Sequence, residues 1–250
     1  MLEAGARLEG LTFTDLDIEG ADLTDVGLTG CTIEDSVFAD AGLEGARFVR
    51  CRLLRCRFQH VDLRDAVFED CGFYDAGART GASFAFCRLQ QASFRRCDLG
   101  HARFDGAELY GAAMEDCNLV GATFPRSSFA QALGRKVVRV SARLVGCNFE
   151  LADLRGARLA GAELARSRFR ETDLTGADLE GADLTGADLF QAILDGARLA
   201  GADLRGAEVS GLDLRRLATY RGLKIDPEQQ RPLLEAMGVD VRPDRRGSEL

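Results

Sequence analysis

The sequence predicts an all-β fold: a right-handed quadrilateral β-helix, which is a four-sided solenoid of about ten coils. Two observations predict this fold. An apolar residue recurs at every fifth position over most of the chain, and a small residue, often Ala or Cys, lies two positions before it. A period of five matches neither a helix nor a strand. It requires a chain that turns a corner in every repeat, so that four repeats close one coil of about 20 residues.

The apolar column runs in three blocks: Leu8 to Phe73, Phe84 to Phe129, and Leu144 to Leu214. Phe is concentrated in the first two blocks, which predicts stacked rings in the interior. Residues 175–189 read TGADLEGADLTGADL, and glycine at their corners suits a backbone that a side chain would strain. A single coil buries little, but stacked coils share one continuous core. We therefore assign residues 1–216 to the β-helix.

The residue types that usually form catalytic or metal sites are placed here by the five-residue repeat. All eight cysteines occupy the small inner column, where a thiol packs as a small hydrophobe, so we expect neither disulfides nor a metal site: Cys31, Cys51, Cys56, Cys71, Cys87, Cys97, Cys117 and Cys147. The two histidines, His60 and His101, fall at surface positions. The many carboxylates recur on every face, as in a solvated wall. We expect no cofactor and no enzymatic activity.

The repeat is interrupted twice, and interruptions of a solenoid are where function is expected. Near residues 74–81 the step between apolar centres is eleven residues, one more than two repeats. This predicts a smaller loop comprising Asp75, Ala76, Gly77, Ala78, Arg79, Thr80 and Gly81. At residues 130–140 the step is fifteen, but Gly134 and Arg139 fall at the inner places and would not fill the core. This predicts a larger, basic loop comprising Gly134, Arg135, Lys136, Val137, Val138 and Arg139.

The repeat ends before residues 217–243, which we assign to a helix/strand module. Asp226 is the expected N-cap, Pro227 the first helical residue and Gly238 the stop. The module is too apolar for a free tail, so we expect it to cover the open end of the β-helix and to form a homodimer. The residues expected to do so are Leu223, Ile225, Leu233, Leu234, Met237 and Val239. Residues 244–250 are expected to be a disordered tail.

The charge balance excludes some partners. The chain has 40 acidic and 32 basic residues, so we expect no direct binding to nucleic acid. Residues 1–45 hold eleven acids and one base, and residues 171–203 hold eight acids and one base. No apolar run is long enough to span a membrane. The first ten residues lack the basic flank and apolar stretch of a signal peptide, so a cytoplasmic protein is expected.

Several segments resemble the Qnr group of pentapeptide-repeat proteins. RFVRCRLLRCRF at residues 47–58 is similar to the start of their solenoids. FYDAGARTGASF at residues 73–84 resembles their smaller loop, and SSFAQALGRKVVRVSARLVGCNF at residues 127–149 resembles the segment with their larger loop. The end, from GLDLRRL to GLKIDPEQQRPLLEAMGVDVRPD, resembles their dimerisation module. The resemblance covers roughly residues 46–244 and departs at the N-terminus, where about one extra coil is present.

The resemblance implies a DNA mimic. Such a rod would bind bacterial type II topoisomerases, DNA gyrase or topoisomerase IV, and protect them from quinolones or natural-product poisons. It implies that residues 130–140 contact the enzyme and that residues 75–81 assist. The alternative is a structural or scaffold pentapeptide-repeat protein that binds another protein partner.

Overall fold

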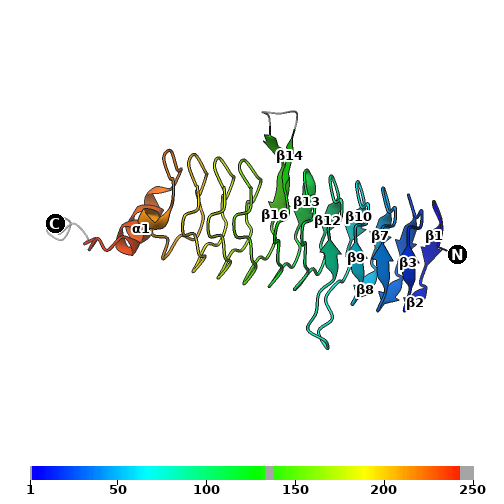
Figure 1. The fold of residues 1–250 in the computed structure, drawn as a ribbon. Helices are drawn as coiled ribbons and strands as arrows, with labels where there is room; N and C mark the ends of the chain where they lie inside the picture. The colour runs from blue at the N-terminus through cyan, green and yellow to red at the C-terminus, as the bar shows by residue number, and fades with distance from the viewer. Residues whose placement is uncertain (1, 133–137, 243–250) are drawn as a thin grey trace.

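The computed structural model describes residues 2–132 and 138–242 of the chain and shows an elongated four-sided solenoid (Figure 1). Three of its sides begin as parallel sheets. Face 1 is the sheet of β1 (Arg7–Glu9), β4 (Gly27–Thr29), β7 (Arg47–Val49), β10 (Val67–Glu69), β12 (Ser93–Arg95), β13 (Ala112–Glu115) and β16 (Ala142–Val145). Face 2 is the sheet of β2 (Thr12–Thr14), β5 (Thr32–Glu34) and β8 (Arg52–Leu54). Face 3 is the sheet of β3 (Asp17–Glu19), β6 (Val37–Ala39), β9 (Arg57–Gln59) and β11 (Ser83–Ala85).

Face 4 has no strand of its own in the described residues and is held by single parallel bridges, beginning with Asp22 to Gly42 and Gly42 to Asp62. The same bridges continue all four faces beyond β16. On face 1, for example, Arg143 pairs with Glu163, Glu163 with Asp183, and Asp183 with Asp203. The pairing partners are twenty residues apart wherever no loop intervenes, which is the coil length expected from the five-residue period.

The interior is built from the apolar column, as the sequence predicts. On face 3 the rings of Phe38, Phe58, Phe84 and Phe104 stack in turn, with centroids 4.9, 5.1 and 5.1 Å apart. On face 1, Phe68 stacks between Phe48 and Phe94 at 4.8 and 4.7 Å. The expectation of stacked rings is confirmed. Offset stacking adds to the free energy that burial of these large side chains already contributes.

The small inner column is also as expected, because all eight cysteines are buried and free. Six of them form a ladder behind face 2, and each thiol donates to a carbonyl oxygen of the preceding coil at 3.2–3.7 Å: Cys31, Cys51, Cys71, Cys97, Cys117 and Cys147. Ser167 continues the ladder with a 2.8 Å bond to the Leu144 carbonyl. Burial raises the pKa of the Cys56 and Cys87 thiols to about 12. These thiols are packing groups, not nucleophiles.

At the regular corners of the coils, the residue two places after the apolar centre has a positive φ, whether or not it is glycine. Phe86 has φ 55°, and its ring lies against Gly106 of the next coil, where a Cβ would come within 2.6 Å of the ring. The His60 ring stacks on the other side of Phe86 at 5.2 Å. A bulky corner residue is therefore seated on a glycine one coil further along.

The structure gives the path of the chain through the first interruption and corrects the end of the solenoid. Phe73 lies on face 2 and Phe84 on face 3, where Phe84 pairs with Phe58. The eleven-residue step is therefore one repeat of five with six residues looped out, not two repeats and one extra residue. The solenoid also does not end at residue 216, because Thr219 pairs with Arg198 and Lys224 pairs with Asp203. The five-residue apolar period ends before residue 219, whereas backbone pairing continues to Lys224. The coil that contains Thr219 and Lys224 has short loops in place of regular corners.

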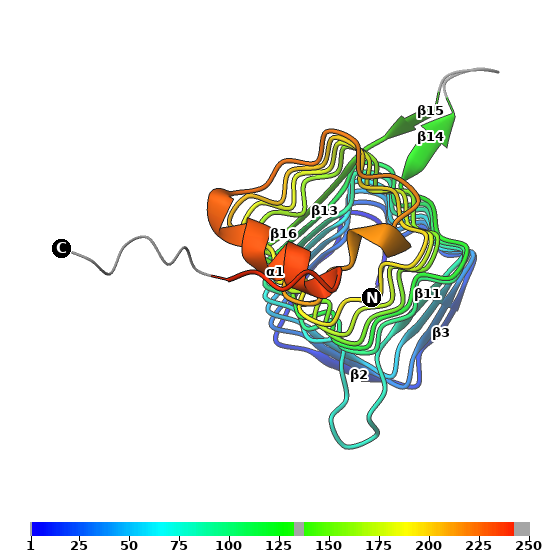
Figure 2. The ribbon, with the colours of Figure 1, turned by 90° about the vertical axis from the view of Figure 1, so that its left-hand side faces the viewer.

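The C-terminal end is covered by helical turns: η1 (Leu214–Arg216), η2 (Pro227–Gln229) and α1 (Gln230–Ala236) (Figure 2). Asp226 is the N-cap of η2, and Gly238 follows α1 with φ 84°. The buried Gln229 amide donates to the carbonyl oxygens of Leu204 and Ala207, both at 2.7 Å. The C-terminal segment thus provides hydrogen-bond donors to carbonyl groups that would otherwise be unpaired at the end of the solenoid.

Candidate partner-binding surface

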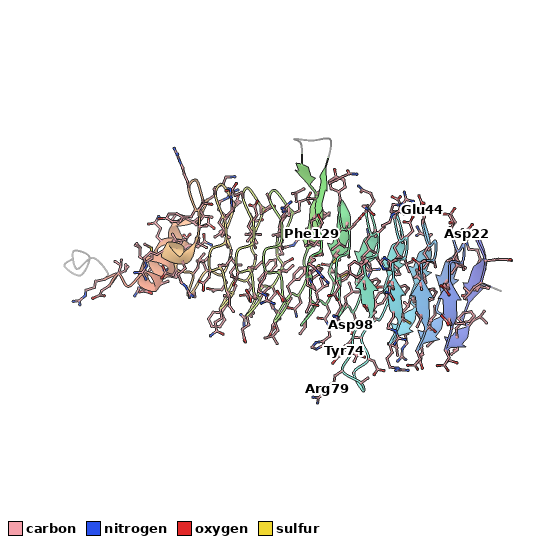
Figure 3. All side chains as sticks on the ribbon, viewed as in Figure 1. Asp22, Glu44, Tyr74, Arg79, Asp98 and Phe129 are labelled. Atoms are coloured by element: carbon pink, nitrogen blue, oxygen red, sulfur yellow. The ribbon has the colours of Figure 1, made fainter. Side chains whose placement is uncertain are left out.

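The larger interruption is an antiparallel hairpin of β14 (Ala130–Ala132) and β15 (Val138–Val140), which leaves the wall between faces 4 and 1. Phe129 stays in the interior at its base (Figure 3). In the hairpin, Ala130 pairs with Val140 and Ala132 with Val138. Of the residues expected to contact a partner, Val138 and Arg139 lie in β15. Gly134, Arg135, Lys136 and Val137 lie outside the described residues.

The smaller loop leaves the wall between faces 2 and 3 and is closed on itself. The backbones of Asp75 and Thr80 exchange hydrogen bonds of 2.8 and 3.2 Å. Inside the loop, the Asp75 carboxylate accepts the N–H groups of Gly77 and Ala78 at 2.8 and 3.0 Å. Arg79, at the tip, has φ 54° and extends away from the rod (Figure 3). Ala76 and Gly81 complete the loop, which is therefore a preformed projection.

This loop is held from both sides by the coils next to it. The Arg55 guanidinium, twenty residues earlier, binds the Asp75 carboxylate and also Asp35 at 2.6 and 2.7 Å. On the other side the Tyr74 ring lies 5.4 Å from that of His101. The N–H of Ala78 and then the Arg55 guanidinium hold the pKa of Asp75 below its usual value. Neither Arg55 nor Tyr74 was predicted as a site residue, although Arg55 lies one coil, twenty residues, before Asp75 in the sequence.

Asp75→Ala is expected to loosen this loop while leaving the rod intact. The substitution removes the acceptor of two loop amides and the partner of Arg55, so the amides of Gly77 and Ala78 should exchange with solvent about tenfold faster at pH 7. Hydrogen exchange measured by NMR tests this. Arg96→Gln is the control, because Arg96 pairs with Asp70 in the same way but does not touch the loop. Equal exchange in wild type and Asp75→Ala would contradict the assignment.

The pH dependence of the same loop follows from the lowered pKa of Asp75. A carboxyl group whose pKa is lower in the folded state stabilises that state above its unfolded pKa, which is about 4. The contribution is lost as the pH falls through the folded pKa. Protection of Gly77 and Ala78 should therefore be constant from about pH 5 upward and fall below about pH 4.

The two projections lie at diagonally opposite corners of the rod, because one follows face 2 and the other follows face 4. Figure 2, which looks along the rod, shows them pointing in different directions. Faces 3 and 4 join them on one side of the solenoid, and faces 1 and 2 on the other. A partner large enough to touch both projections would also have to lie against two faces of the wall.

The two acidic regions of the sequence differ in their pairing. Among the described residues, the acids of the N-terminal region that pair with arginine are Glu34, Asp35 and Glu44, and the first coil has none. In the second region arginines neutralise several acids, as Arg170 does for Asp188 and Arg205 for Asp203 at 2.7 Å. The least compensated negative charge therefore lies at the N-terminal end of the rod.

The C-terminal segment combines a cap with exposed apolar groups. Leu233 is 3% exposed and packs into the end of the core, so it belongs to the cap, and Leu223 and Ile225 pack partly against the same core. Leu234 and Val239 are 41% and 46% exposed. A hollow of about 190 Å³ lies beside α1 and is lined by Leu214, Ile225, Gln230, Leu233, Leu234 and Met237.

Within residues 2–132 and 138–242, no cluster of three or more His, Cys, Asp or Glu side chains has the arrangement of a metal site. None of the helices in that part of the chain is long and apolar enough to cross a membrane. The surface described above thus offers projections, charge and apolar contact, which are the means of binding a macromolecule.

Comparison with known proteins agrees with this architecture. The family profile described as pentapeptide repeats (8 copies) matches residues 152–189 and 182–216. The profile described as pentapeptide repeat region matches residues 43–124. A search of curated proteins found no match.

Solved structures give longer matches. Full-length QnrB1, described as a plasmid-mediated fluoroquinolone resistance protein, superposes with a TM-score of 0.70 at 25% identity, covering 91% of this chain and 100% of QnrB1. A trypsin-treated QnrB1 variant gives 0.72 at 26% identity, with 92% and 99% covered. HetL, involved in heterocyst differentiation regulation in the cyanobacterium Nostoc, gives 0.51 at 22% identity, with 87% and 88% covered. The likeness to HetL shows the fold alone.

Proposed function

This chain belongs to the pentapeptide-repeat family, and we propose that it is a DNA mimic that binds a bacterial type II topoisomerase. By occupying DNA gyrase or topoisomerase IV, it protects the enzyme from quinolones or natural-product poisons. The observation that carries the proposal is the similarity to QnrB1 over the whole length of that protein, whose description names fluoroquinolone resistance. A scaffold protein would need only the regular wall, whereas this chain also carries two projections with defined geometry.

The physical basis of the proposal is charge and shape. An enzyme that binds duplex DNA does so with lysine and arginine side chains that neutralise phosphates. A narrow rod with uncompensated carboxylates at one end can compete for such a surface. Charge attraction is screened beyond about 8–10 Å in physiological salt, so it guides the encounter but gives little selectivity. We assign selectivity to the β14–β15 hairpin, with the smaller loop assisting.

The proposal includes a homodimer formed through the C-terminal segment. Leu234, Met237 and Val239 are the residues for this contact, because Leu233 is already used by the cap. Two-fold pairing of identical surfaces is the commonest arrangement of soluble homo-oligomers. Such a dimer would place the two acidic N-terminal ends at its outer tips and double the length available to the topoisomerase.

The direct test is a topoisomerase assay with the purified chain. Gyrase and topoisomerase IV are each incubated with plasmid DNA and either a fluoroquinolone or a natural-product poison, and the yield of cleaved DNA is measured. We expect the chain to raise the poison concentration needed for half-maximal cleavage at least severalfold, without consuming any substrate of its own. No change with either enzyme and any poison would contradict the proposal and favour a scaffold that binds another protein.

A further inference from the structure

Face 4 carries a hollow at the foot of the β14–β15 hairpin. Its volume is about 300 Å³, and its lining comes from consecutive coils and from β14: Gln90, Glu108, Tyr110, Ser128, Ala130 and Gln131. The coils are adjacent, because Arg88 pairs with Glu108 and Glu108 with Ser128 along the face. The hollow therefore lies beside the projection that the proposed function assigns to partner contact.

One residue of the wall of the hollow, Gln90, has a buried polar atom that lacks a partner. The side-chain nitrogen of Gln90 donates to the Glu108 carboxylate, but the side-chain oxygen of Gln90 is buried and accepts no hydrogen bond from any described residue. Buried acceptors are nearly always satisfied, because leaving one without a donor costs free energy. The Gln90 oxygen therefore lies below the surface of the hollow, and Glu108 and Tyr110 are the groups that a ligand in the hollow can reach.

The hollow also contains an uncompensated charge. Glu108 has no ion pair within 4.0 Å among the described residues, and the nearest arginine along the face, Arg88, pairs with Asp62 at 3.3 Å. Tyr110 lies beside Glu108 and contributes an aromatic ring. A carboxylate and an aromatic ring together favour a cation that carries several N–H donors. The guanidinium of arginine fits best, since it has five donors in one plane and also packs on aromatic rings.

We propose that this hollow is a receptor for a basic side chain, preferably arginine, from the DNA-binding surface of the partner topoisomerase. This inference rests on the proposed function for the identity of the partner, but its chemistry depends only on the hollow. A DNA mimic meets the lysine and arginine side chains that would otherwise contact phosphate. A receptor for one of them at the foot of the hairpin fixes the rod in a single register, which a uniformly charged wall cannot do.

The chemistry can be tested without a topoisomerase. The probe is acetyl-arginine methylamide, compared with the uncharged acetyl-citrulline methylamide, and the readout is the NMR shifts of the Tyr110 ring and the Gln90 side-chain amide. We expect saturable shifts with the arginine probe that are lost in Glu108→Gln and kept in Glu150→Gln. Glu150 is the matched control, because it lies on the opposite face and also has no ion pair among the described residues. Equal shifts with both probes, or unchanged shifts in Glu108→Gln, would overturn the proposal.

The second measurement places the hollow in the complex. Binding of the rod to gyrase is measured for wild type, Glu108→Gln and Glu150→Gln at low and physiological salt. We expect Glu108→Gln to weaken binding about five- to tenfold, with Glu150→Gln within twofold of wild type. If wild type binds and Glu108→Gln binds equally, the hollow is not the receptor although the proposed function stands. If wild type does not bind, the proposed function fails while the arginine titration still decides the chemistry of the hollow.

Discussion

Deletion of residues 131–140, with Ser141→Gly, is expected to abolish protection of the topoisomerase while leaving the solenoid folded. The deletion converts the fifteen-residue step from Phe129 to Leu144 into a regular repeat of five, with Ala142 in the small inner column. Position 141 then becomes a corner of the kind that glycine occupies in the neighbouring coils, as at Gly111 and Gly161. Solenoid stability depends on contacts between adjacent coils, and these contacts are retained.

The measurement is poison-induced DNA cleavage by gyrase, together with thermal unfolding to verify the fold. Deletion of residues 75–80 is the matched control, because it restores a five-residue step from Phe73 to Phe84 and places Gly81 at the corner. We expect the first deletion to remove protection completely and the second to reduce it in part. Full protection by a folded rod without the hairpin would show that the hairpin takes no part in binding.

Phe84→Ala is expected to have the largest effect on stability, lowering the free energy of unfolding by about 3–5 kcal/mol. The Phe84 ring is fully buried, stacks at 5.1 Å on both Phe58 and Phe104, and meets the edges of Phe73 and Phe94 at 5.5 and 6.0 Å. Its removal would leave a cavity that the surrounding rings, fixed by their own coils, cannot fill.

Phe86→Ala is the control, since Phe86 lies two residues away but is 45% exposed. Its ring contacts His60 and the Arg126 guanidinium on the surface, so the loss should be only about 0.5–1 kcal/mol. Urea denaturation followed by circular dichroism compares the two variants. Similar midpoints for both would show that the stacked column is not the main source of stability in this part of the rod.

The fold could be predicted from the sequence because the period of five determines every inward position. Leu8, Phe84 and Leu204 are equivalent in the repeat, and a single rule places them all. The positions of the two interruptions were equally visible. What the period could not supply was the path through an interruption, because a loop can replace a face or leave from a corner. For this reason the loop between Phe73 and Phe84 could be predicted, but not that six residues leave the wall and five form one repeat.

The details of the candidate surface were harder to predict from the sequence, for a related physical reason. Contacts between neighbouring coils join residues about twenty apart, as Arg55 joins Asp75 and Cys51 joins the Leu28 carbonyl. Such contacts depend on side-chain rotamers as well as on register. The hollow beside Tyr110 depends in addition on where the hairpin leaves the wall, and nothing in the local sequence indicates this. Leu233 was expected at a dimer contact because apolar spacing alone does not distinguish a cap from an interface.

The seating of Phe86 on Gly106, one coil further along, has a consequence for how this rod can change length. Each coil is matched to the next by its corner residues as well as by its backbone, so the natural unit of insertion or deletion is a whole coil. Loss of one regular coil between β16 and the cap would preserve every inward position and shift nothing except the distance from the hairpin to the C-terminal end. The share of this chain that QnrB1 leaves uncovered is about the length of one coil. The spacing between binding features along such rods should therefore vary in whole coils, each advancing the rod by roughly one strand spacing of about 4.8 Å.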